Sequence, residues 1–167
     1  MIEIRHRIGN RFDWVAVAIA FVSLWSCADD NDLSGSLEEV YQLQYDQVRA
    51  RLYSSELAIE YMASQSGVVP VRVTLDRRSL RKADKELDSG QSYDLKRYGD
   101  ITGRQADGTE LFRFSSGNLE LDAFEPEQDS EVRGSFDAKF RVGDDSFSLT
   151  GDFQSELELV PEPNLPE

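Results

Sequence analysis

The side chains that most often carry out catalysis are confined to the start of this chain. His6 is the only histidine and Cys27 the only cysteine among the 167 residues. Downstream of Cys27 the sequence therefore lacks the residues for a Ser-His-Asp or Cys-His nucleophile and for an imidazole zinc site. Carboxylate pairs, Ser with Lys, and hard-cation sites remain, but no spacing singles out one pair among so many carboxylates. We expect a domain that is not an enzyme and uses no cofactor.

Four carboxylates alternate with other residues in the last third of the chain. Glu125, Glu127, Asp129 and Glu131 stand two positions apart, and calcium prefers several oxygen ligands of this kind. The run lacks the glycine and the order of a known calcium loop. We therefore interpret it as a solvated turn, with a calcium site as the alternative, and we expect no metal centre.

Positive charge gathers in one stretch of an otherwise acidic chain. With 32 acidic and 18 basic residues, the formal net charge is −14, which argues against nucleic acid as a partner. The basic stretch suits an acidic partner or anionic head groups. Pairing with Asp76, Asp84, Glu86 and Asp88 is the alternative that we favour, because exposed pairs are common. The cations of this basic patch are Arg72, Arg77, Arg78, Arg81, Lys82 and Lys85.

The N-terminal segment has the layout of an export signal. Arginines at positions 5, 7 and 11 precede an uncharged apolar run over 14–25, which suits a signal peptide but is short for a transmembrane span. The segment ends in Leu24-Trp25-Ser26-Cys27, with Leu three positions before Cys and a small residue directly before it. This motif resembles the lipobox of bacterial lipoproteins, and the resemblance covers residues 1–27.

The lipoprotein resemblance implies a processed and anchored protein. Residues 1–26 would be the signal peptide, and Cys27 would become the lipidated first residue of the mature chain, held at the membrane by several acyl chains. Because Ala28 rather than an aspartate follows Cys27, the resemblance implies the outer membrane of a cell envelope. Residues 27–32 would form a short acidic tether, and residues 161–167 a disordered tail. The alternative is a signal anchor with a free Cys27.

Between the tether and the tail, residues 33–160 contain many short stretches in which apolar and polar side chains alternate. The longest, 131–159, has Phe136 and Phe140 in one inward row and Phe153 in a second, with a turn at 143–146 between them. A period of two over this length predicts a β-hairpin. Gly134 and Gly151 within it indicate bulges or the close approach of another backbone.

Further strands are expected over 57–63, 69–75, 93–95, 101–105, 109–114 and 117–123, with a hairpin turn at 106–108. Residues 77–87 fit a short helix or a loop. Residues 37–52 fit a strand or a helix, and we favour the strand because of their Val and Tyr content. Eight or nine short strands predict an all-β domain, either an antiparallel β-sandwich or a small closed barrel. The run 117–153 resembles uncharacterised β-rich secreted and lipoprotein domains, which implies a fold and no function.

Together these features predict a non-catalytic, membrane-anchored envelope lipoprotein. Its β-domain would bind or scaffold a partner such as an envelope protein or a glycan. The alternative is a carrier of small ligands or lipids, whose barrel cavity would be lined by the Phe-rich inward rows.

Overall fold

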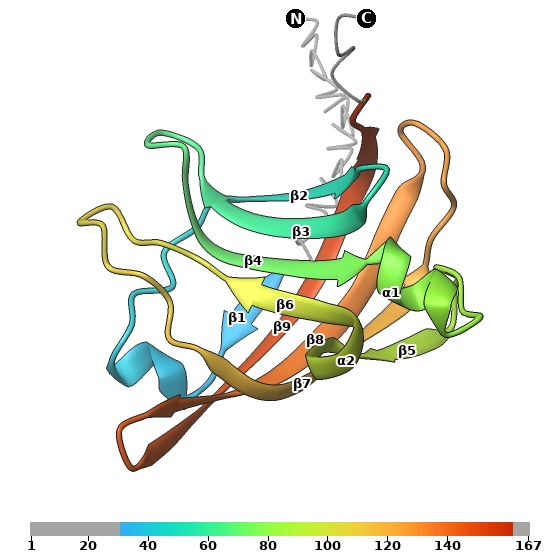
Figure 1. The fold of residues 1–167 in the computed structure, drawn as a ribbon. Coiled ribbons are helices and arrows are strands. Elements are labelled where there is room, and N and C mark those ends of the chain that lie inside the picture. Colours follow the sequence, from blue (N-terminus) through green and yellow to red (C-terminus); the bar gives the residue numbers. More distant parts are fainter. Residues whose placement is uncertain (1–30, 162–167) are drawn as a thin grey trace, which may run out of the picture.

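The computed structural model describes residues 31–161, and these form an all-β fold (Figure 1). The prediction of an all-β domain with eight or nine strands is confirmed. The nine strands are β1 (Asp32–Ser34), β2 (Gln47–Leu52), β3 (Glu56–Ala63), β4 (Val68–Asp76), β5 (Gln91–Asp94), β6 (Gly99–Thr102), β7 (Phe114–Ala123), β8 (Glu131–Val142) and β9 (Asp145–Leu159). Between them lie the 3-10 helix η1 (Ser36–Glu39) and the short helices α1 (Arg77–Lys82) and α2 (Leu95–Tyr98).

The strands form one sheet that is nearly closed into a barrel. Their order is β5-β7-β8-β9-β2-β3-β4-β6, with β1 paired to β9 beside this path. In Figure 1 the layer of β2, β3, β4 and β6 crosses over the layer of β7, β8 and β9. The two end strands of the sheet, β5 and β6, are joined by α2. A covalent connection therefore bridges the open seam of the barrel.

Strand β9 holds the two layers together because it pairs with both. Its residues 145–156 pair with β8, and residues 150–152 pair with β1 on the opposite edge. Its last three residues turn to β2, where Leu157 lies opposite Ala50 in a parallel ladder. The Ser155 hydroxyl donates to the Val48 carbonyl at 3.2 Å, which extends the junction below this ladder.

Aromatic side chains fill the interior of the barrel. Tyr61, Phe140 and Phe153 are fully buried, so two of the phenylalanines expected to line a carrier cavity are packed into the core. The Tyr61 hydroxyl donates to the Asp152 carbonyl at 2.8 Å. Burial raises the pKa of Tyr41 to about 12, with a further contribution from the charge of Asp107, so that this phenol stays neutral.

The expected strand over 37–52 is wrong in its first part. Leu37 lies in η1, the chain has no regular structure over 42–46, and the strand begins only at Gln47. Leu37 and Tyr41 are both buried, and the Tyr41 amide donates to the Leu37 carbonyl at 3.0 Å. Both patterns place residues 37 and 41 on one face, but the chain satisfies its backbone groups here through a helical turn and not through pairing with a neighbouring strand.

Two other segments differ from expectation. The expected strand over 109–114 is reduced to one isolated bridge, between Arg104 and Glu110, before β7 begins. Helix α2 was not foreseen; Asp94 caps it by accepting from the Lys96 amide at 2.9 Å, and its Leu95 is buried. Within residues 31–161 no helix has the length and apolar character to cross a membrane.

Glycines and phenylalanines interlock across the β8–β9 hairpin. Gly134 lies opposite Phe153, and Phe136 lies opposite Gly151. A Cβ at Gly134 would overlap the Glu120 carbonyl oxygen and stand 2.8 Å from the Phe153 ring, and one at Gly151 would overlap the Phe136 ring. Each ring therefore covers the glycine of the other strand, an arrangement that stabilises glycine within a sheet.

We expect Gly134→Val and Gly151→Val each to lower the free energy of unfolding by about 1–3 kcal/mol, because the added side chain must displace a packed ring or a strand. Chemical denaturation of the full chain measures the effect. Lys139→Val, at an exposed position of β8, is the control and should change stability by less than about 0.5 kcal/mol. Equal effects at all three positions would contradict the interlock.

Candidate functional site

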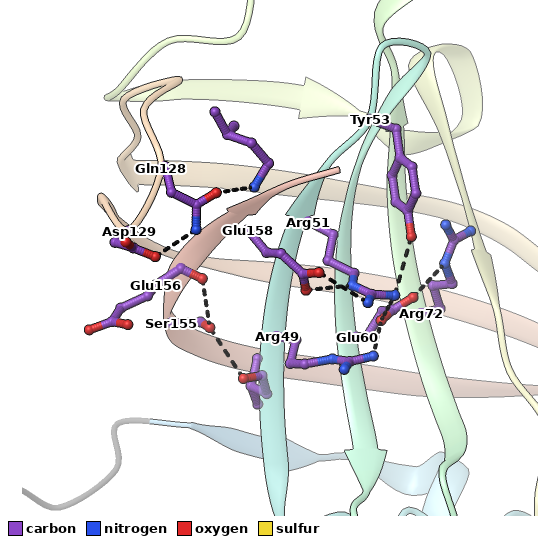
Figure 2. A network of polar contacts seen from close by, with 12 residues as sticks. Arg49, Arg51, Tyr53, Glu60, Arg72, Gln128, Asp129, Ser155, Glu156 and Glu158 are labelled. Atoms are coloured by element: carbon purple, nitrogen blue, oxygen red, sulfur yellow. Dashed lines mark hydrogen bonds and ion pairs between the residues drawn. The ribbon is translucent and has the colours of Figure 1, made fainter. Parts of the chain in front are cut away.

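The outer face of β2, β3 and β4 carries a row of opposite charges. Arg49, Glu60 and Arg72 lie directly opposite one another on these strands. Arg72 Nε donates to Glu60 Oε1 at 3.1 Å, and Arg49 Nη2 donates to Glu60 Oε2 at 3.3 Å. Figure 2 shows the Glu60 carboxylate between the two guanidinium groups. The Glu60 side chain is only 8% exposed, so these ion pairs replace its contacts with water.

Further carboxylates complete the row. Arg51 donates to both oxygens of Glu158, at 2.8 and 3.3 Å, and these hydrogen bonds hold the pKa of the Glu158 carboxyl below its ordinary value. Arg72 also donates to Glu56 at 2.5 Å. Burial alone would lower the pKa of Arg72, but its hydrogen bonds to Glu56 and Glu60 outweigh burial and raise it. Because its charges are matched, the row stabilises the sheet and leaves little charge for a ligand.

A second group of charges surrounds a hollow beside α1. The hollow has a volume of about 260 Å³ and lies between β2, α1 with the loop that follows it, and the loop between β7 and β8. Arg77, Arg81 and Lys85 stand on its rim together with Glu86. Its floor is apolar and consists of Leu52, Leu80, Leu87, Phe124 and Pro126. We refer to these nine residues as the α1 hollow.

Local hydrogen bonds place the rim of the α1 hollow. Asp76 caps α1 by accepting from the Arg78 amide at 2.7 Å and the Ser79 amide at 3.2 Å. Burial would raise the pKa of Asp76, but these hydrogen bonds outweigh it and lower the pKa. Leu80 is buried beneath the helix, and Arg77 Nη1 donates to the Tyr53 carbonyl at 3.0 Å.

In the described part of the chain, the cations of the rim have no carboxylate as a close ion-pair partner. Within residues 31–161, no ion pair of 4 Å or less involves Arg77, Arg81 or Lys85. The pairing with Asp76 that we favoured is replaced by its role as a helix cap. Lys85 Nζ lies 5.7 Å from the centre of the Tyr98 ring, an orientation that suits a cation-π contact. The rim thus combines unpaired positive charge with an apolar floor.

The structure divides the predicted basic patch into separate places. Arg77, Arg81 and Lys85 come together at the α1 hollow. Arg78 and Lys82 are exposed on α1 but do not line the hollow, and Arg72 belongs to the charged row on the sheet. The apolar floor was not predicted as a site. Leu80 and Leu87 were its only local signal, as apolar positions within a charged stretch.

The acidic run lies in the loop between β7 and β8 and at the start of β8. The Ser130 hydroxyl donates to the carbonyls of Glu125 and Glu127, at 2.6 and 2.8 Å. Asp129 accepts from the Gln128 side chain, and Glu131 accepts from Gln154. In the described part of the chain, no three acidic, histidine or cysteine side chains gather as ligands for a metal ion.

Comparison of the chain with protein-family models, curated proteins and solved structures finds no match. The fold itself, a nearly closed β-barrel with a hollow at its surface, is compatible with a binding or carrier domain. Cys27, with the lipobox and most of the tether, lies outside the described residues, as do residues 162–167. Their predicted roles therefore stay predictions.

We expect Glu60→Ala to lower the free energy of unfolding by about 2–3 kcal/mol, because it leaves Arg49 and Arg72 half-buried without their shared carboxylate. Thermal or chemical denaturation of the full chain measures this. The matched control is Glu110→Ala, which removes the exposed pair with Arg104, whose side chains are 65% and 72% exposed. That control should lose less than about 1 kcal/mol. Similar losses in both variants would show that the buried row has no special role.

Proposed function

We propose that this chain is a membrane-anchored envelope lipoprotein whose β-domain binds an acidic partner in the α1 hollow and catalyses no reaction. The observation that carries the proposal is the cluster of unpaired cations around an apolar floor in a strongly acidic protein. A binding site of this composition suits a protein segment in which an apolar side chain stands next to carboxylates. Guanidinium groups favour such segments because they bind carboxylates through paired hydrogen bonds.

The anchoring part of the proposal rests on the lipobox-like motif that ends in Cys27. In this proposal, several acyl chains on Cys27 hold the domain at the outer membrane, since one chain alone binds to a membrane only marginally. The described fold begins a few residues after Cys27: the Asn31 side chain accepts from the Gln154 amide at 2.6 Å, and β1 follows directly. The tether is therefore short, and the domain would stay close to the bilayer.

A carrier of small ligands or lipids is the second candidate. One observation favours it: the α1 hollow has an apolar floor next to cations, which suits the polar end of an anionic amphiphile. Its volume of about 260 Å³ is slightly below the range of about 300–1,000 Å³ that is usual for small-molecule sites. A carrier would therefore hold only part of a lipid there, since Phe140 and Phe153 are packed into the core.

For the anchor, we expect Cys27→Ala to accumulate as unprocessed precursor or to appear in the soluble fraction, because the acylated atom is the cysteine sulfur. Membrane fractionation of a bacterial host and labelling with radioactive palmitate measure this. Ser26→Ala, which keeps a small residue before the cysteine, should behave as the original chain does. A correctly cleaved Cys27→Ala protein that stays in the membrane would refute the lipid anchor.

For the binding site, we expect the full chain in neutral detergent to bind a labelled Glu-Glu-Leu-Glu-Glu peptide, with an affinity that falls as salt is added. Fluorescence anisotropy measures the dissociation constant. Reversing two of the three rim cations, Arg81→Glu with Lys85→Glu, should weaken binding at least about tenfold, or about 1.4 kcal/mol.

The matched control is Lys139→Glu with Arg141→Glu, at exposed positions of β8. It makes the same change in net charge and should bind the peptide as the original chain does. If the peptide binds equally to all three proteins, or to none, the α1 hollow is not the site. A labelled fatty acid in place of the peptide tests the carrier: saturable binding that the rim reversal abolishes would favour it over the acidic protein partner.

A further inference from the structure

A second hollow of the surface lies between β2 and β9. The two strands pair only over residues 50–52 and 157–159, and a groove with a volume of about 660 Å³ lies where this pairing ends. Among the described residues, none lines both this groove and the α1 hollow. We call it the β2–β9 groove, and it is lined by residues 31, 45–50, 128–129 and 154–158.

Hydrogen bonds hold several polar side chains of the β2–β9 groove in place. Gln128 Nε2 donates to Asp129 Oδ1 at 2.6 Å, and Gln128 Oε1 accepts from the Leu159 amide at 2.9 Å. At the start of β2, Asp46 accepts from the Ser64 amide at 2.8 Å and from the Ser64 hydroxyl at 2.9 Å. Because these groups are oriented before a ligand arrives, less conformational entropy is lost when the ligand binds.

Other side chains of the groove have hydrogen-bonding capacity that the fold does not use. Within residues 31–161, no hydrogen bond or ion pair involves the side chain of Gln47 or the carboxylate of Glu156, and both residues are exposed. Gln154 donates from its side-chain nitrogen to Glu131 at 2.9 Å, which leaves its side-chain oxygen for a ligand. A side-chain amide donates and accepts, whereas a carboxylate only accepts. Hydroxyl groups can pair with both kinds of group, because they also donate and accept.

The charges of the groove favour an uncharged ligand. Its described lining has four carboxylates and Arg49 as its only cation, which disfavours an anion. Most of these carboxylates already have partners, since Glu158 accepts from Arg51 with both oxygens, and Asp46 and Asp129 accept the hydrogen bonds given above. In the part of the chain that the structure describes, no three such side chains gather around a position for a metal ion.

Tyr45 adds an aromatic ring to the groove. Its hydroxyl donates to the Asn31 carbonyl at 2.9 Å, and its ring stands edge-on to the Tyr61 ring, with the ring centres 5.0 Å apart. These contacts hold the half-buried ring in one orientation. A fixed ring of this kind presents an apolar body beside a polar tip, which suits the C–H face and the hydroxyl groups of a sugar.

We propose that the β2–β9 groove binds a short, neutral oligosaccharide. Its hydroxyl groups pair with the side chains of Gln47, Gln154 and Glu156, and one sugar ring packs against Tyr45. The volume of about 660 Å³ lies within the range of about 300–1,000 Å³ that is usual for small-molecule sites. Because the groove shares no described residue with the α1 hollow, this site goes beyond the proposed function and does not depend on it.

The first test measures sugar binding by the full chain in a polyoxyethylene detergent, which has no sugar head group. The probes are cellotetraose, maltotetraose and chitotetraose, and nuclear magnetic resonance of the isotope-labelled chain follows its backbone amides. We expect at least one probe to bind with a dissociation constant of about 1 mM or less and to shift the amides of residues 45–50 and 154–158. If no probe gives a saturable shift, or if the shifts lie only elsewhere, the proposal is wrong.

The second test removes hydrogen-bonding groups from the groove. Gln47→Ala with Glu156→Ala should weaken sugar binding at least about tenfold, because the sugar loses several hydrogen bonds while no contact of the fold is broken. The matched control is Gln91→Ala with Glu120→Ala, at exposed positions of β5 and β7, and it should bind the sugar as the original chain does. Equal affinities of the two variants would overturn the proposal.

The third test distinguishes the neutral sugar from other ligands and the groove from the α1 hollow. Tetragalacturonate should bind at least about tenfold more weakly than the best neutral probe, because the groove repels anions, and equal binding would contradict the proposal. Tetralysine that shifts residues 154–158 when no sugar does would show a cation site instead. Arg81→Glu with Lys85→Glu should leave sugar binding unchanged even if it abolishes peptide binding. Loss of sugar binding in this variant would place the sugar at the α1 hollow and refute the proposal.

Discussion

The two layers of this barrel depend on the short parallel ladder between β2 and the last residues of β9. Leu157 and Leu159 pair there with Ala50 and Leu52, while the rest of β9 belongs to the opposite layer. One strand thus belongs to both layers, which cross one another (Figure 1). The buried Tyr61 hydroxyl, bonded to the Asp152 carbonyl, connects the layers again from the inside. The other core residues pack between the two layers that these contacts connect.

Charge is used in two different ways on the surface of the domain. On β2, β3 and β4, each arginine of the row has a carboxylate partner, and the central Glu60 is nearly inaccessible to water (Figure 2). Around α1, by contrast, the acidic residue nearest the helix start caps backbone amides and leaves the cations unmatched. In a protein with a net charge of −14, these cations create a local region that attracts anions, whereas most of the surface repels them. This contrast distinguishes the α1 hollow from the structural row.

The sequence predicted the parts of the fold that depend on neighbouring residues. An uninterrupted period of two predicted strands β8 and β9. Gly134 and Gly151 within them indicated a close approach of other groups, and the structure shows such close packing at both. For the turn at Leu37 we favoured a strand over a helix, and helix α2 was not predicted, because long-range burial of Leu37 and Leu95 decides both. Of the α1 hollow, the sequence predicted the cations but not the apolar floor. Its cations lie close together in sequence, but Leu52 and Phe124 reach its floor from distant strands, and no local pattern indicates that meeting.

The parallel ladder of β2 and β9 also governs the order in which the domain can fold. The β8–β9 and β2–β3 hairpins join neighbouring segments and can form early, whereas Ser155 and Val48 at the layer junction are 107 positions apart. Contacts of such high sequence separation slow folding, because the loop must close before they form. Until β9 arrives, one edge of β2 stays open to strands of other chains. A chain of this topology would therefore be most prone to aggregate after its hairpins have formed and before its barrel has closed.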